Sequence, residues 1–102
     1  MATAEHFTFL MRECGYEEPR LIGQDRYACL MPLLFTYAII TGRVGDRIGY
    51  EDRWCYQDRE TAAAALESWS GKGEPSGWHR HPASGRRRRL CESGAATEWV
   101  DP

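Results

Sequence analysis

The hydrophobic pattern of the chain begins with a short apolar segment at His6–Met11. Phe7, Phe9 and Met11 occupy every second position of this segment. A period of two favours a β-strand, although the same run could also open a helix. The stretch Gly15–Gln24 contains glycine, proline and two glutamates, so it is predicted to be a loop.

Two segments in the middle of the chain have the composition of strands. Arg26–Met31 is a short strand candidate, and Pro32, which lacks a backbone donor, marks its end or a sheet edge. Leu33–Thr41 is rich in β-branched and aromatic residues and is apolar on both faces. This pattern is typical of a central strand that a helix covers on one side.

A third strand follows a glycine-containing turn at Gly42–Asp46. Arg47–Tyr56 alternates, which predicts an antiparallel hairpin with Leu33–Thr41. One face of this strand is expected to hold Ile48, Tyr50, Trp54 and Tyr56, and the other to hold Gly49, Glu51, Arg53 and Cys55.

The clearest element is a helix over residues 58–70. Asp58 can cap its N-terminus, and Glu60 lies near the positive end of the helix dipole. Ala62, Ala65, Leu66 and Trp69 form an apolar stripe, and Gly71 is the expected stop. We expect Leu66 and Trp69 to bury against Phe35, Ile39 and Trp54.

Together these elements predict an α+β fold. A small antiparallel sheet packs against the one main helix, and a basic C-terminal arm follows. The 102 residues suffice for a single domain spanning 1–102, in which residues 84–96 are expected to form a mobile basic segment.

Charge is distributed unevenly along the chain. Its net charge is −2, but Gly77–Arg89 carries five arginines and no acidic residue. Arginine outnumbers lysine twelve to one. Guanidinium groups suit phosphate and carboxylate partners, whereas arginine-rich codon usage is an equally good explanation of the overall bias.

Cysteine spacing and hydropathy bear on the cellular setting. Cys14, Cys29, Cys55 and Cys91 form no Cys-x-x-Cys pair, and no signal peptide is recognisable at the N-terminus. We therefore expect free thiols in a reducing cytoplasm. No apolar run approaches the roughly 20 residues that span a bilayer, so no membrane association is expected.

Three sequence segments carry a resemblance to a known group of proteins. They are Leu33–Ile40, Asp52–Tyr56 before the alanine-rich helix, and Gly73–Pro82 followed by Gly85–Arg88. The chain resembles a family of short bacterial and phage proteins with a Gly-Glu-Pro-x-Gly-Trp-x-Arg-His-Pro segment before an arginine run. The resemblance implies one intact domain, a bacterial or phage setting and no catalytic residue. It also implies that Trp78–Pro82 is a fixed motif.

The candidate binding residues all fall in the basic segment. They are Trp78, His79, Arg80, His81, Arg86, Arg87, Arg88 and Arg89. Arginines that neutralise phosphates release counterions, and the indole and imidazoles could stack on exposed bases. The alternative is a solvated tail, or arginines that pair with the acidic part of the same chain.

Metal binding and catalysis receive less support from the residues. His79 and His81 have strand-like ligand spacing and Cys91 follows them, but only the distant His6 and Cys14 could complete a zinc site. No phosphate-binding glycine loop or nucleophile elbow is present. We therefore predict no metal, no cofactor and no enzymatic activity.

Two binding hypotheses remain. In the first, a small bacterial or phage accessory protein binds an anionic partner, nucleic acid or an acidic protein surface, through the arginine-rich arm. In the second, it is an inhibitor or adaptor that contacts a host protein through an acidic and aromatic sheet face, where Tyr37 and Tyr50 could be exposed. The oligomeric state and the pathway are open.

Overall fold

The computed structural model describes residues 2–78 and 88–89, the latter as backbone only. Its helices and strands, in chain order, are α1 (Thr3–Arg12), β1 (Glu17–Leu21), β2 (Arg26–Pro32), β3 (Tyr37–Arg43), β4 (Gly49–Tyr50), β5 (Asp52–Tyr56), α2 (Arg59–Ser68) and β6 (Arg88–Arg89). The predicted α+β class is confirmed.

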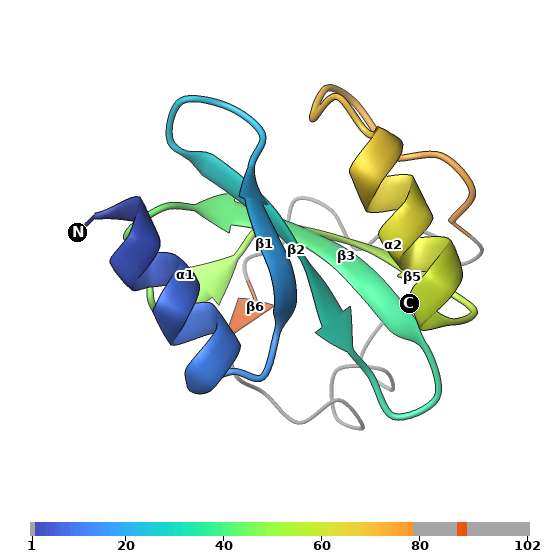
Figure 1. Ribbon diagram of the computed structural model, residues 1–102, viewed down its shortest axis with the longest axis horizontal. Coiled ribbons are helices and arrows are strands. Elements are labelled where there is room, and N and C mark those ends of the chain that lie inside the picture. The colour runs from blue at the N-terminus through green and yellow to red at the C-terminus, as the bar shows by residue number, and fades with distance from the viewer. Residues whose placement is uncertain (1, 79–87, 90–102) are drawn as a thin grey trace.

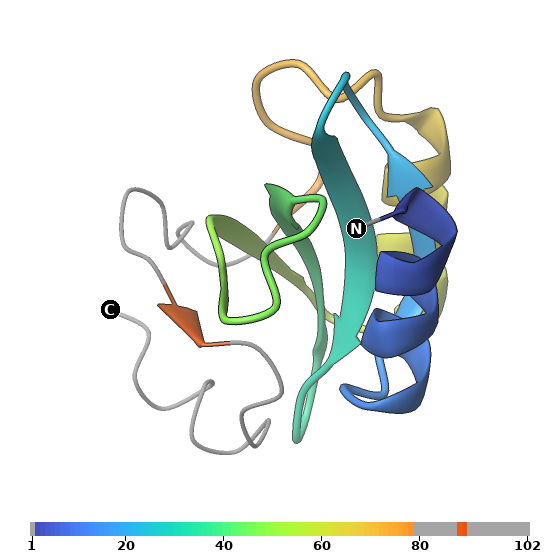
Figure 2. The ribbon, with the colours of Figure 1, turned by 90° about the vertical axis from the view of Figure 1, so that its left-hand side faces the viewer.

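Four of the strands form one antiparallel sheet in the order β1-β2-β3-β5, and β4 pairs with β6 in a separate ribbon. In Figure 1 the sheet runs between α1 on the left and α2 on the right. Figure 2 shows β6 beyond β4, on the far side of the molecule from α1 and α2.

Alternation along β2 divides the core into two layers. Tyr27 and Cys29 lie in a buried cluster with Leu10 of α1. Ala28 and Leu30, which point to the opposite face, lie in a cluster with residues of α2. The sheet is therefore covered by a helix on each face, not by one main helix alone.

The N-terminal segment is a helix, so the predicted strand at His6–Met11 is wrong. His6 and Leu10, four positions apart, are both fully buried, whereas Met11 is half-exposed. Residues at this spacing share one helix face, and that face packs on the sheet. Glu5 in the first turn and Arg12 in the last also suit the helix dipole.

The predicted loop Gly15–Gln24 contains the edge strand β1. Its pairing with β2 shifts between Glu17 and Arg20, and Glu18 adopts a positive φ of 50°. Proline and an irregular register are tolerated at a sheet edge, because that edge needs no further partner. Arg20 donates to the Leu66 carbonyl at 3.0 Å, which fastens this edge to α2.

The hairpin between β3 and β5 is confirmed, but β3 starts later than predicted. Leu33 donates its backbone N–H to the Thr36 carbonyl, so a turn occupies the beginning of the predicted strand. Phe35 lies in this turn and is 74% exposed. Its predicted place in the core is wrong, whereas Ile39, Trp54, Leu66 and Trp69 do form one cluster.

The predicted strand Arg47–Tyr56 is interrupted at Glu51, and this break reverses part of the predicted face assignment. Glu51, which lies between β4 and β5, donates its backbone N–H to the Thr41 carbonyl at 2.7 Å. As a result Tyr50 is buried on the α1 side, and Trp54 is buried on the α2 side. The predicted exposure of Tyr50 is therefore wrong.

The cap of α2 follows the prediction. The Asp58 carboxylate accepts from the Thr61 N–H and from its hydroxyl, both at 2.8 Å, and these bonds lower the pKa of Asp58. The helix ends at Ser68, before Gly71, whose φ of +93° suits glycine.

We expect Asp58→Ala to lower the melting temperature by several degrees, because the orphan Thr61 N–H loses its acceptor. Asp58→Asn keeps a side-chain acceptor and should stay close to the wild type. Thermal denaturation followed by circular dichroism measures both. Equal losses in the two variants would contradict the capping role.

The cysteines agree only in part with the expected free thiols. Cys29 and Cys55 are free and buried. Cys14, however, is disulfide-bonded, which corrects the expectation for this residue. Disulfides are typical of oxidising compartments, so free thiols no longer support the cytoplasmic location, which stays a prediction.

Neither described helix has the length and apolar character needed to cross a bilayer.

Candidate functional site

Trp78, the first residue of the predicted site, is attached to the folded body. Its side chain is half-buried and packs against the cluster between the sheet and α2. Just before it, the Tyr56 hydroxyl donates to the Ser76 carbonyl at 2.8 Å. The chain therefore enters the basic segment from a fixed position beside β5.

The end of the basic segment is attached at a second place. The backbone of Arg88 pairs with Tyr50, and that of Arg89 with Gly49, in the antiparallel ribbon of β4 and β6. These two arginines lie within the segment 84–96. The other predicted site residues, His79, Arg80, His81, Arg86 and Arg87, lie outside the described residues.

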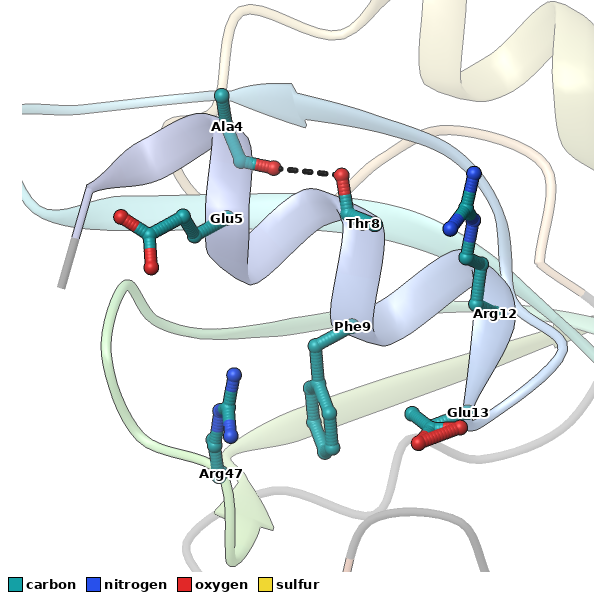
Figure 3. Close-up of a pocket in the computed structure, with 7 residues that line it drawn as sticks. All are labelled: Ala4, Glu5, Thr8, Phe9, Arg12, Glu13 and Arg47. Atoms are coloured by element: carbon teal, nitrogen blue, oxygen red, sulfur yellow. Dashed lines mark hydrogen bonds between the residues drawn. The ribbon is translucent and has the colours of Figure 1, made fainter.

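A pocket of about 610 Å³ lies beside the loop that leads into β4 (Figure 3). It is lined by Ala4, Glu5, Thr8, Phe9, Arg12, Glu13 and Arg47. The Arg47 guanidinium carbon lies 4.8 Å from the centre of the Phe9 ring, a cation–π contact. Arg47 starts the predicted strand Arg47–Tyr56, and Phe9 belongs to α1, so no local pattern predicted their contact.

Both signs of charge line this pocket. In Figure 3 the Phe9 ring lies between Arg47 and Glu13, whereas Arg12 points away from the ring and Glu5 extends from the first turn of α1. Only two residues separate Arg47 from Tyr50 of β4, which holds β6. Arg47 is exposed, and its guanidinium lies on the α1 side of the folded body, over Phe9.

His6 lies beneath the Phe9 ring and is fully buried. The two rings stack at 5.9 Å, and the His6 ring meets Tyr27 edge-on at 5.1 Å. The Gly45 N–H donates to His6 Nδ1 at 2.9 Å, which ties α1 to the loop that carries Arg47. The sequence suggests His6 only as a distant metal ligand.

The described residues contain no cluster of three or more histidine, cysteine or acidic side chains that could hold a metal ion. Cys29 is completely buried, and burial raises the pKa of its thiol far above neutrality. A buried neutral thiol is a poor nucleophile, so this cysteine serves as a small core residue. The predicted His79 and His81 lie outside the described residues.

Comparison with known proteins adds no relative, because no family model, curated protein or solved structure matches the chain. The resemblance to short bacterial and phage proteins stays a prediction.

Proposed function

We propose that this protein is a non-enzymatic binding module whose arginine-rich segment, from Trp78 to Arg89, contacts the phosphates of single-stranded nucleic acid. The observation that carries this proposal is the attachment of the segment at both ends. Trp78 packs against the α2 side of the sheet, and Arg88–Arg89 pair with β4.

Attachment at two points favours a contact surface over a solvated tail. A segment whose ends are fixed loses less conformational entropy when it binds than a free tail loses. Five arginines in such a segment repel one another, and an anionic partner relieves that repulsion. Guanidinium groups also bind phosphate oxygens in pairs, which lysines do not.

One feature favours nucleic acid over an acidic protein surface. Trp78, His79 and His81 provide rings that can stack on unpaired bases beside the arginines. Arg47, on the loop before β4, is exposed, but its guanidinium lies over Phe9 of α1 and adds nothing to this choice. The alternative sheet-face interaction loses one expected contact, because Tyr50 is buried.

We expect a variant with Arg86–Arg89 all replaced by glutamine to bind a fluorescent single-stranded oligonucleotide at least tenfold more weakly than the wild type, a loss of about 1.4 kcal/mol. Wild-type affinity should fall with salt, with a logarithmic slope of roughly 0.7 for each phosphate contacted. The slope of the variant should be shallower. Fluorescence anisotropy over a salt series measures both quantities.

Arg43→Gln is the matched control, because Arg43 is an arginine on β3 whose side chain is 65% exposed and which, among the described residues, forms a long ion pair with Glu51. It should bind almost as the wild type does. Circular dichroism establishes that both variants are folded. Equal affinity of the quadruple variant and the wild type at low salt would overturn the role of the arginine run. Binding of an acidic peptide but no oligonucleotide would overturn the nucleic-acid assignment.

A further inference from the structure

We propose that His6 is a pH-sensitive latch: neutral, it holds the β3–β4 loop against α1, and its protonation at acidic pH releases that loop. The inference concerns the folded body and does not depend on nucleic-acid binding. The latch itself is the hydrogen bond from the Gly45 N–H to His6 Nδ1, which is 2.9 Å long.

The hydrogen bond fixes the tautomer of the neutral His6 imidazole. Because Nδ1 accepts the Gly45 N–H, the single proton of neutral His6 must lie on Nε2. Nε2 is buried and has no hydrogen-bond partner among the described residues. Protonation would place a hydrogen on Nδ1, and two N–H groups cannot share that bond. The charged form is therefore incompatible with the observed contact.

The groups around the ring add to this incompatibility. His6 is fully inaccessible, and its burial lowers its pKa. Arg47, on the loop side, acts in the same direction, whereas the backbone and the carboxylate of Asp46 partly oppose it. On the β2 side lies Tyr27, whose pKa burial raises, so its hydroxyl stays neutral and provides no anion for a charged histidine.

The loop that the latch holds carries Arg47 and leads directly into β4. Gly45 has a φ of +97°, and Val44 donates to the Asp25 carbonyl of the neighbouring loop at 2.8 Å. The Asp46 carboxylate accepts from the N–H of Ile48 and from the N–H of Gly49, the first residue of β4. Release of Gly45 would consequently reach Arg47, which lies over the α1 residue Phe9, and the beginning of β4.

The sign of the pH effect follows from the direction of the pKa shift. A histidine whose pKa is lowered in the folded state stabilises the fold in its neutral form. This stability is fully present above the unfolded pKa of 6.5 and is lost as the pH falls through the folded pKa. Within that window the unfolding equilibrium constant should rise by up to about tenfold per pH unit.

The test is an NMR titration of the intact chain from neutral to mildly acidic pH. A variant with His79→Gln and His81→Gln leaves His6 as the only histidine signal, because the chain contains three. We expect His6 to titrate below 6.5 and the Gly45 amide shift to follow with the same midpoint. A Gly45 amide that does not respond to the titration of His6, or a His6 midpoint at or above 6.5, would overturn the latch.

His6→Asn is the matched variant, because its side-chain oxygen can accept the Gly45 N–H and does not titrate in this range. We expect the Gly45 amide to lose its pH response and the acid-dependent loss of stability to disappear. Unchanged pH dependence in this variant would also overturn the proposal. If His6→Asn does not fold, the NMR titration of the chain that retains His6 still tests whether the Gly45 amide follows His6. Since none of these measurements uses an oligonucleotide, their failure is distinct from failure of the proposed function.

Discussion

Replacing Leu66 with alanine should destabilise the protein by about 2–5 kcal/mol. Leu66 is only 2% exposed and is the largest aliphatic side chain that α2 contributes to the cluster with Ile39 and Trp54. Its truncation removes buried methyl groups and leaves a cavity that the rigid sheet cannot close. The free energy of unfolding from urea denaturation measures the effect.

Leu34→Ala is the control, because the same atoms are deleted from a side chain that is 55% exposed. Its free energy of unfolding should stay within about 0.5 kcal/mol of the wild type. Equal stability of Leu66→Ala and the wild type would mean that α2 packs through a different face.

The elements that the sequence predicted well are those whose pattern is local and complete. Asp58 followed by an alanine-rich run specifies the start of α2, and the cap forms as expected. The β-branched and aromatic run around Ile39 likewise specifies a buried strand. In both cases each residue favours the same local structure, so tertiary packing has nothing to override.

The elements that were missed depend on contacts between distant residues. Period-two spacing at Phe7 and Phe9 suggested a strand, but burial of His6 with Leu10 against the sheet selects the helix. The strand β1 contains Pro19, and its pairing is visible only once β2 lies beside it. The break at Glu51 depends on a hydrogen bond to Thr41, a residue of another strand.

The candidate site shows the same division. The arginine run and Trp78 are contiguous, so composition alone marks them as candidates. The pairing of β6 with β4 joins segments about forty positions apart in the sequence. Arg47 contacts Phe9 only because α1 packs beside the loop before β4. No spacing rule predicts such meetings, because they depend on how the elements pack.

Close packing between β2 and β3 gives the second large prediction, at Gly42. Gly42 pairs directly with Tyr27, whose fully buried ring lies across the glycine. A Cβ atom at Gly42 would lie 2.6 Å from the Tyr27 hydroxyl oxygen and 2.8 Å from Cζ. The ring is fully buried and meets His6 and Phe7 of α1 edge-on, so it cannot move away without disturbing the core.

Gly42→Ala should therefore destabilise the fold by about 1–3 kcal/mol, as measured by urea denaturation, although alanine is otherwise acceptable in a strand. In Gly23→Ala the nearest atom to the added Cβ is 3.9 Å away, so this control should be neutral or slightly more stable. Tyr27→Phe removes the closest contact, and the Tyr27 hydroxyl has no hydrogen bond among the described residues. In that background the cost of Gly42→Ala should be smaller, because the closest atom, the hydroxyl oxygen, is gone. Some cost should remain, because the ring carbons still crowd the new methyl group. Equal costs in the tyrosine and phenylalanine backgrounds would show that the clash lies elsewhere than at the hydroxyl.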